Sequence, residues 1–202
     1  MTAAPNRLFF ALWPDDATRV HAHAAAAALQ EQQHPGGYLI KPQRYHITLL
    51  FLGDFVPPEQ EALALQAAAT VKIPPFSLRL ERAGGFRNRK VPCWLGPEHP
   101  PAVLELLHKD LHMAMMRAQV KPERLRFVPH LTIIRDAKHT LPSTAVKPIE
   151  WLIHEFVLIR SVLQRQPPEY QILRRYPLDP SAPAPAVTPE QLALLPELSQ
   201  PS

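Results

Sequence analysis

The chain has 202 residues, of which 46% are hydrophobic and 20% charged, a balance typical of a globular protein with its own core. A formal charge of +4 with a sequence pI near 9.4 suits a phosphate-bearing partner without requiring one. No apolar run approaches the roughly 18 residues of a membrane helix, and the early run at 8–13 is too short for a secretory signal. A single cysteine excludes an internal disulfide or a thiolate zinc cluster. We therefore expect a cytoplasmic protein that does not associate with membranes.

Apolar periodicity and turn residues divide the chain into strands and helices. In chain order, we expect a strand at 7–13, a helix at 14–33, a strand at 44–52, a helix at 57–71, strands at 76–81 and 91–95, a helix at 101–119, and strands at 127–135, 154–163 and 169–178. A turn is expected at Gly84 and Gly85. In the third helix, Leu104, Leu107 and Leu111 have helical spacing and predict a side that faces the core. This order indicates an α+β protein built as two lobes.

The composition changes near the C-terminus. Seven of the last 26 residues are proline, and charged residues are sparse. We interpret residues 1–178 as a single two-lobed domain and residues 179–202 as a Pro-rich tail outside the core. Within the tail, 188–191 has the spacing of a capping box before three leucines, so a short helix at 188–198 is an alternative to disorder.

One four-residue pattern occurs twice, as His-Ile-Thr-Leu at 46–49 and His-Leu-Thr-Ile at 130–133, 84 residues apart. Ten histidines and eight threonines would produce fewer than one His-x-Thr triplet by chance. Each copy lies in an apolar run that predicts a strand, where residues two apart share a face. The His and Thr of each copy therefore lie on the face opposite the aliphatic residues, and such polar pairs are costly to bury without partners. The two copies predict one site lined from both halves of the chain.

Two histidines that face each other across a cleft are suited to acid–base catalysis. Near neutral pH, one of His46 and His130 can be neutral while the other is protonated. The hydroxyls of Thr48 and Thr132 can donate hydrogen bonds to oxygens that gain charge in the transition state. This set fits an in-line displacement at phosphorus, for which Arg135 is the candidate cation. In a flat strand Arg135 has the wrong parity for the site, so either a bulge or twist turns it inward or it is a surface arginine.

Other chemistries have weaker support. His108 and His112 have i, i+4 spacing, but no glutamate of a protease pattern lies between them and no third metal ligand is apparent. Neither a Walker motif nor a Gly-x-Gly-x-x-Gly occurs, and we expect no cofactor and no metal. Phe51 follows the first motif and is a candidate for stacking on a base of a single-stranded end. Its parity with Ile47 and Leu49 favours packing in the core instead.

These motifs resemble those of the two-histidine phosphoesterases, specifically the RNA 2′,3′-cyclic phosphodiesterase (2′-5′ RNA ligase) family. The resemblance covers nearly the whole folded chain, and the doubled motif is specific in this context. It is carried by residues 7–14, 46–53, 93–96, 129–135, 170–173 and 176–178. The tail beyond Leu178 has no counterpart in that resemblance.

The resemblance implies a bilobal α+β fold in which two antiparallel sheets form a V-shaped cleft, with the helices outside. It also implies metal-independent hydrolysis of a terminal 2′,3′-cyclic phosphate to a 2′-phosphomonoester, with reversible 2′-5′ RNA ligation as a related activity. In that scheme His46 is the proton donor and His130 the proton acceptor, while Thr48, Thr132 and Arg135 bind the phosphate. The near-symmetric sequence does not by itself assign acid and base. The expected partner is an RNA or oligonucleotide end with a 2′,3′-cyclic phosphate, bound by a monomer.

Two alternatives stay open. A phosphodiesterase of small cyclic nucleotides or of 2′-5′ oligonucleotides would use the same chemistry within different cleft walls. A non-catalytic RNA-end binder would keep the cleft without turnover, although the presence of both histidines and both threonines does not favour it.

Overall fold

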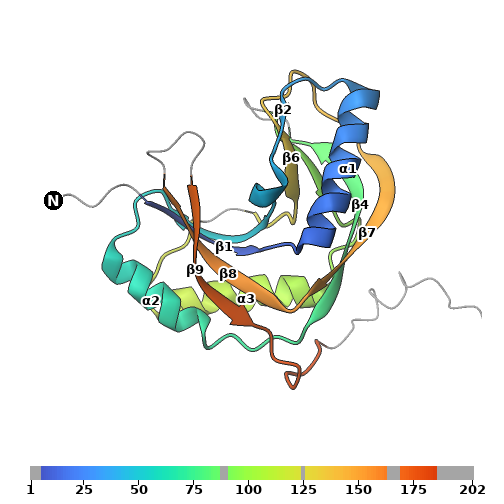
Figure 1. The fold of residues 1–202 in the computed structure, drawn as a ribbon. Helices are drawn as coiled ribbons and strands as arrows, with labels where there is room; N and C mark the ends of the chain where they lie inside the picture. Colours follow the sequence, from blue (N-terminus) through green and yellow to red (C-terminus); the bar gives the residue numbers. More distant parts are fainter. Residues whose placement is uncertain (1–5, 87–90, 124–125, 163–168, 186–202) are drawn as a thin grey trace, which may run out of the picture.

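The computed structural model describes residues 6–86, 91–123, 126–162 and 169–185, and its chain path is drawn in Figure 1. In chain order, its elements are β1 (Asn6–Leu12), α1 (Asp16–Gln33), β2 (Tyr38–Leu39), the 3-10 helix η1 (Pro42–Arg44), β3 (Ile47–Gly53), α2 (Pro58–Ala68), β4 (Phe76–Gly85), β5 (Cys93–Gly96), α3 (Ala102–Arg117), β6 (Leu131–Arg135), β7 (Thr144–Ile153), β8 (Glu155–Val162) and β9 (Glu169–Pro177). The α+β class expected from the sequence is confirmed.

The described strands form an antiparallel sheet made of two four-stranded halves. One half has the order β7-β4-β5-β6 and the other β3-β1-β8-β9, and the short β2 adds to β6. Read outward from the junction, each half begins with a motif strand and adds three antiparallel neighbours, so the halves are related by an approximate twofold axis. The two sheets expected from the sequence are thus joined through a pair between β3 and β6, Ile47 with Leu131.

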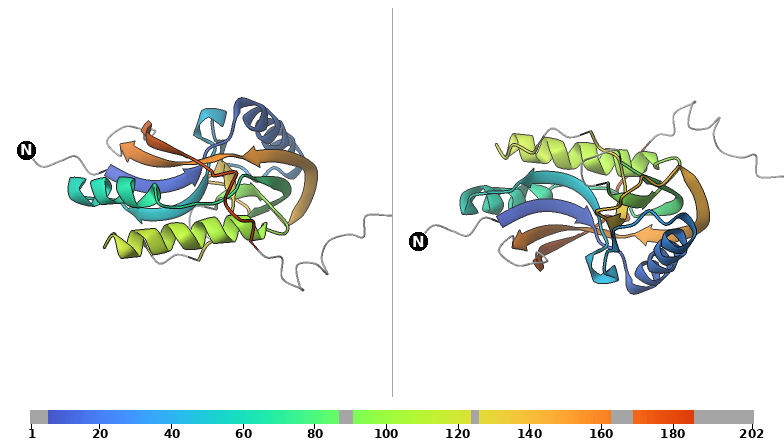
Figure 2. Two further views of the ribbon diagram at one scale, coloured as in Figure 1. Left: turned by 90° about the horizontal axis from the view of Figure 1, so that it is seen from below. Right: turned by 90° about the horizontal axis from the view of Figure 1, so that it is seen from above.

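The helices cover the outside of the two halves, as Figures 1 and 2 show. Helix α1, from the N-terminal part of the chain, packs against β7 and β6 of the opposite half. Helices α2 and α3 pack against each other, and α3 also packs against β3. Each half of the sheet is thus covered by a helix whose sequence neighbours lie in the other half. Most buried side chains belong to one continuous hydrophobic core. In the described residues, no helix combines the length and apolar character needed to cross a membrane.

Local signals explain where the long helices begin and which side they bury. The Asp15 carboxylate accepts a hydrogen bond from the Thr18 amide at 2.7 Å, an N-cap worth about 1 kcal/mol. The expected core side of the third helix is confirmed, because Leu104, Leu107 and Leu111 are all fully buried in α3. Burial of leucines at this spacing contributes about 1.5–3 kcal/mol each and fixes the face that α3 presents to the sheet.

One strand was not predicted and one expected turn is wrong, and both differences have physical causes. Strand β7 was missed because Pro148 interrupts its apolar pattern, but β7 is an edge strand, where proline removes no essential ladder hydrogen bond. The expected turn at Gly84 and Gly85 is wrong, because both residues belong to β4. A Cβ on Gly84 would lie 2.7 Å from Cζ2 of Trp94, so this glycine provides room for the indole rather than a turn.

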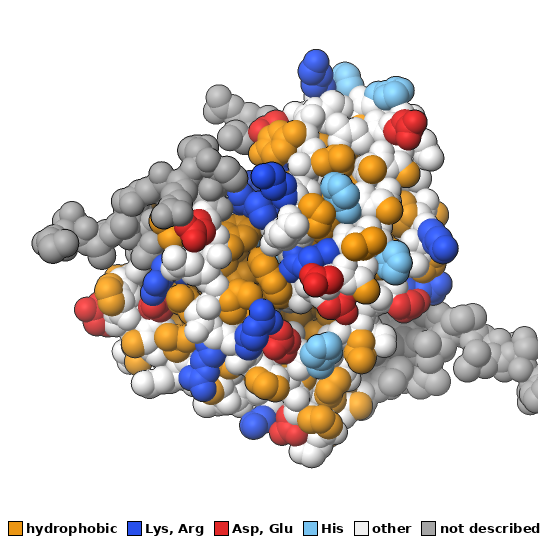
Figure 3. Space-filling view, in the orientation of Figure 1, with side chains coloured by type: hydrophobic (Ala, Val, Ile, Leu, Met, Phe, Trp, Pro, Cys, Tyr) orange, Lys and Arg blue, Asp and Glu red, His pale blue; other side chains and the backbone are white. Residues whose placement is uncertain are grey.

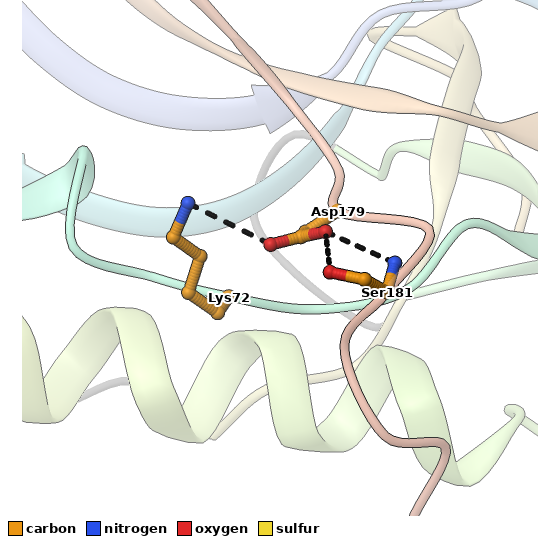
Figure 4. A network of polar contacts seen from close by, with 3 residues as sticks. All are labelled: Lys72, Asp179 and Ser181. Atoms are coloured by element: carbon orange, nitrogen blue, oxygen red, sulfur yellow. Dashed lines mark hydrogen bonds and ion pairs between the residues drawn. The ribbon is translucent and has the colours of Figure 1, made fainter.

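The chain stays attached to the core for a few residues after β9. The amide of Asp179 donates to the carbonyl of Ile73 at 2.8 Å, and its carboxylate lies 3.7 Å from Nζ of Lys72. The same carboxylate accepts hydrogen bonds from the amide and the hydroxyl of Ser181, as Figure 4 shows. These are exposed contacts and hold the chain weakly. The helix considered for 188–198 lies outside the described residues.

Candidate active site

The two His-x-Thr motifs meet at the junction between the sheet halves. Ile47 lies opposite Leu131, and both side chains are fully buried. Neighbours of an antiparallel pair point to the other face, so the motif residues on either side of this pair project away from the core. Each histidine then lies across from the threonine of the other motif: His46 across from Thr132, and Thr48 across from His130. All four are half-buried.

The first motif strand contains a bulge directly after its threonine. Ala11 of β1 lies opposite Thr48, but the next residue back, Phe10, lies opposite Leu50. Leu49 is therefore an extra residue, and Leu49 and Leu50 are both buried.

The second motif strand has a bulge at the matching position. Trp94 of β5 lies opposite Thr132, whereas Cys93 lies opposite Ile134. The extra residue is Ile133, and again two consecutive aliphatic side chains, Ile133 and Ile134, are buried.

The bulges decide where the residues after the motifs point. An extra residue reverses the alternation, so Arg135 shares the face of Thr132 despite its parity. Arg135 is exposed and borders the same hollow as Thr132 and His130. The expectation that Phe51 shares the face of Ile47 and Leu49 is wrong for the same reason. Phe51 is half-buried and packs in a small cluster on the face of Thr48, apart from the main core.

Both histidines are held in the same way by their own backbone. Nδ1 of His46 lies 2.8 Å from the carbonyl oxygen of Arg44, and Nδ1 of His130 lies 2.6 Å from that of Val128. A carbonyl oxygen only accepts, so Nδ1 carries the proton in each ring. This leaves Nε2 of each imidazole as the nitrogen that can take or give a proton.

Aromatic rings surround His46. Its ring centroid lies 5.2 Å from Phe9 and 5.4 Å from Tyr170, and Trp13 stacks on it at 6.3 Å with an interplanar angle of 21°. The guanidinium of Arg44 lies 4.6 Å above the Tyr170 ring. Phe9 lies in β1 and Trp13 directly follows the last residue of that strand, so their even spacing places both rings on the same face. This wall excludes water from one side of His46.

His130 has a smaller aromatic wall from the other half of the sheet. Phe86 meets it edge-on at 4.8 Å and lies 5.7 Å from the Trp94 ring. Trp94 is the cross-strand neighbour of Thr132, so the space that Gly84 provides for the indole also shapes this side of the site.

Among the described residues, two hollows adjoin the motif residues, and His130 borders both. One, of about 330 Å³, is lined by Tyr38, Pro92, His130, Thr132, Arg135 and Asp136. The other, of about 270 Å³, is more apolar and is lined by Thr48, Leu49, Leu50, Phe51, His108, Glu123, Arg126, Phe127, Val128 and His130. Figure 3 shows apolar side chains in the hollow between the halves, with lysine and arginine side chains beside it. The arrangement provides a polar, cationic compartment next to an apolar one.

The electrostatics of the two histidines differ. Burial lowers the pKa of His46 to about 4; the Arg44 carbonyl opposes this shift, while the charges of Arg135, His130 and Arg44 add to it. Burial also lowers the pKa of His130, and the Val128 carbonyl opposes that shift. Arg135 and His130 therefore lie near enough to His46 for their charges to disfavour its protonation. In the site without substrate, burial disfavours protonation of both histidines.

Sequence reasoning missed most of the aromatic walls. Phe9 and Trp13 belong to a run that is apolar on both faces, so nothing in the sequence indicates which face meets the site. Tyr38 belongs to β2, a two-residue strand too short to give a pattern. His108 is half-buried, its Nδ1 donates to the Leu49 carbonyl at 2.8 Å, and its ring stacks on Phe127 at 4.3 Å. Among the described residues, no three His, Cys, Asp or Glu side chains gather as a metal site would need.

Comparison with known proteins identifies relatives that share this plan. The family model described as the 2′-5′ RNA ligase superfamily matches residues 14–165. The chain is 30% identical over 177 residues to the RNA 2′,3′-cyclic phosphodiesterase of Escherichia coli (strain K12), covering 86% of this chain and 97% of that protein. It is 31% identical over 193 residues to the RNA 2′,3′-cyclic phosphodiesterase of Thermus thermophilus, covering 85% of this chain and 90% of that protein.

Solved structures give the same result for the fold. The crystal structure of E. coli LigT in apo form matches with a TM-score of 0.72 at 30% identity, covering 87% of this chain and 99% of that one. The crystal structure of TT0787 of Thermus thermophilus matches with a TM-score of 0.69 at 26% identity, covering 87% of this chain and 100% of that one. The bilobal architecture expected from the sequence is confirmed.

Proposed function

Because the chain belongs to the 2′-5′ RNA ligase superfamily, we propose that it is an RNA 2′,3′-cyclic phosphodiesterase. It hydrolyses a terminal 2′,3′-cyclic phosphate to a 2′-phosphomonoester by acid–base catalysis between two histidines. The observation that carries the proposal is the Ile47–Leu131 pair, around which both His-x-Thr motifs project to one face. The relatives at 30% and 31% identity, each named RNA 2′,3′-cyclic phosphodiesterase, support the same activity.

In the proposed reaction, Nε2 of neutral His130 removes a proton from water as the water attacks phosphorus. The 3′ oxygen leaves on the opposite side and receives a proton from Nε2 of His46, which gives a 2′-phosphate and a free 3′-hydroxyl. The hydroxyls of Thr48 and Thr132 and the guanidinium of Arg135 hold the non-bridging oxygens, where charge develops in the transition state. Replacement of water by a 5′-hydroxyl in the same step gives a 2′-5′ phosphodiester, so ligation needs no further catalytic group.

The proton-donor role of His46 requires that substrate binding change its pKa. At a pKa of about 4, His46 is neutral at pH 7 in the empty site, and Arg135 disfavours its protonation further. A bound phosphodiester adds a negative charge beside both groups, which favours the imidazolium form and compensates the arginine. We therefore propose that the substrate phosphate itself charges His46, so that the acid forms only in the complex.

The RNA partner follows from the walls of the site. Aromatic rings beside His46 and the apolar hollow at Phe51 and Phe127 suit bases stacked on a single-stranded end. We propose that residues 1–178 form the catalytic domain, that the protein acts as a monomer in the cytoplasm, and that the residues after 178 are dispensable for turnover. Light scattering of the purified protein and activity after truncation at Leu178 test these points.

The deciding assay compares an oligoribonucleotide that ends in a 2′,3′-cyclic phosphate with a 2′,3′-cyclic mononucleotide, in excess chelator. We expect turnover of the oligonucleotide and a loss of about 10²–10⁴-fold in His46→Ala and in His130→Ala. Thr48→Ala and Thr132→Ala should lose less, because each removes one hydrogen bond to the phosphate. Near-normal rates in either folded histidine variant, or turnover that requires an added metal ion, would contradict the proposal. Faster turnover of the mononucleotide would favour the small-nucleotide alternative.

A further inference from the structure

Arg19 is a buried cation that lines neither of the two hollows beside the motif residues. It lies in the first turns of α1 and is 7% exposed, and no other charged side chain in the described residues is classed with the buried ones. Burial lowers its pKa, while the nearby Asp16 and Asp15 raise it. A buried guanidinium is energetically expensive unless its hydrogen-bond donors are used. In Arg19, Nη1 has acceptors among the described residues, whereas Nη2 is buried without one. Its contacts therefore indicate what it stabilises.

The partners of Arg19 are the residues that lead into the first motif. Nη1 donates to the carbonyl of Pro42 and, at 3.4 Å, to the carbonyl of Tyr45. Pro42 is the first residue of η1, and Tyr45 directly follows its last residue, Arg44. The Arg44 carbonyl is the acceptor for Nδ1 of His46 at 2.8 Å. Arg19 thus fixes the short segment that sets the ring orientation of His46.

A second contact links Arg19 to His46 through Trp13. The guanidinium of Arg19 lies 4.6 Å from the Trp13 ring centroid, and the same indole stacks with the His46 ring at 6.3 Å and an interplanar angle of 21°. One turn further along α1, His23 Nδ1 lies 3.1 Å from the hydroxyl of Tyr45. Helix α1 therefore contacts the segment before His46 through two residues, Arg19 and His23. No comparable arginine contacts the residues that precede His130 among the described residues.

We propose that Arg19 is a positioning residue for His46. Through the carbonyls of Pro42 and Tyr45 and through Trp13, it keeps the imidazole in the Nδ1-protonated form with Nε2 available to the substrate. Arg19 touches neither phosphate nor ribose in this role. The inference rests on the proposed function, because it assumes that His46 transfers a proton. A displacement of the ring by about 1 Å is enough to reduce turnover by about 10²-fold.

The test combines kinetics with nitrogen NMR of the two imidazoles. Arg19→Met should lower kcat by about 10- to 100-fold with KM changed by less than about threefold. In the same protein without substrate, His46 should lose its preference for protonated Nδ1, whereas His130 keeps it and serves as an internal control. A lysine can donate to one carbonyl but has no flat group to stack on Trp13. The kcat and the His46 tautomer preference of Arg19→Lys should therefore lie between those of the wild-type protein and of Arg19→Met. Because the NMR measurement needs no substrate, it stays informative if the proposed reaction is not observed.

Arg160→Met is the matched control. Arg160 is a partly buried arginine of β8 that binds Glu61 of α2, with Nε 3.1 Å from the carboxylate, and it lies outside the site. Its loss should reduce the melting temperature without a change in kcat or in the His46 tautomer. The proposal is overturned if folded Arg19→Met keeps kcat within twofold and the His46 tautomer unchanged. If Arg19→Met does not fold, the same two results in Arg19→Lys overturn it.

Discussion

Phe51 and Arg135 occupy the same position in the two halves of the sheet. Each follows a motif threonine by three residues and lies beyond a one-residue bulge, which turns it to the face of the site. The approximate twofold symmetry thus places an aromatic ring in one half where the other half has a guanidinium. In the proposed function, we expect this difference to orient the substrate, with its phosphate at Arg135 and a base or ribose at Phe51.

We expect the two residues to affect different kinetic constants. Arg135→Gln removes a charge-assisted hydrogen bond that strengthens as charge develops on phosphate, so kcat/KM should fall by about 10²–10³-fold. Phe51→Leu keeps apolar volume but removes the flat ring, so KM for an oligonucleotide should rise by about three- to tenfold while kcat changes little. Steady-state kinetics on a cyclic-phosphate oligoribonucleotide measures both. Loss of kcat alone in Phe51→Leu would show that the ring acts on the chemistry and not on binding.

The motif residues could be predicted from the sequence because strand alternation is a local property. His46 and Thr48 lie two residues apart on an apolar strand, and that spacing alone places them together on one face. The bulges could not be predicted, because an extra residue in one strand is defined only by the register of its neighbour. Strand alternation therefore correctly predicted that the His and Thr of each motif share a face. It predicted the wrong face for Phe51 and left the side of Arg135 open.

The rest of the site escaped prediction for reasons of long-range packing. The residues of β1 are apolar on both faces, so the sequence does not distinguish Phe9, which faces the site, from Phe10, which is in the core. Gly84 suggests a turn because glycine is common in turns, whereas its role depends on an indole ten residues away. Only the folded sheet brings these side chains together.

The depressed pKa of His46 should make the protein less stable in acid. The unfolded chain protonates this residue near its ordinary pKa of 6.5, but the folded protein only at about 4, so unfolding takes up a proton between these values. The free energy of unfolding should therefore fall as the pH drops from about 6.5 to about 4, by at most about 3 kcal/mol from this residue. Urea denaturation at several pH values should show a smaller decrease in His46→Gln. Equal pH dependence in both proteins would mean that His46 is more accessible to water than its aromatic neighbours imply.

Gly84→Ala tests the packing beside Thr132. The added methyl would lie 2.7 Å from the Trp94 ring, which must shift, so we expect a loss of about 1–3 kcal/mol in stability and reduced turnover. The smaller ring in Trp94→Phe should relieve the overlap. In a double-mutant cycle measured by denaturation, the combined variant should lose less stability than the sum of the single variants. Additive losses would show that the two positions do not compete for space.

The regiochemistry of cleavage tests the assignment of acid and base. In a 2′,3′-cyclic phosphate, water can expel either the 3′ or the 2′ oxygen, and hydrolysis without a fixed site gives both products. The Nδ1 hydrogen bonds to the carbonyls of Arg44 and Val128 fix the orientation of the two imidazole rings. Each Nε2 therefore approaches a bound phosphate from one fixed side. A ribose bound in one orientation then permits a single in-line path.

With His46 as the donor to the 3′ oxygen, phosphorus NMR should detect only the 2′-phosphate. A product that is mostly 3′-phosphate would mean either that the two histidines have exchanged roles or that the ribose binds in the reverse orientation. The Phe51→Leu variant separates these cases, because only a reversed ribose moves the base away from the Phe51 ring.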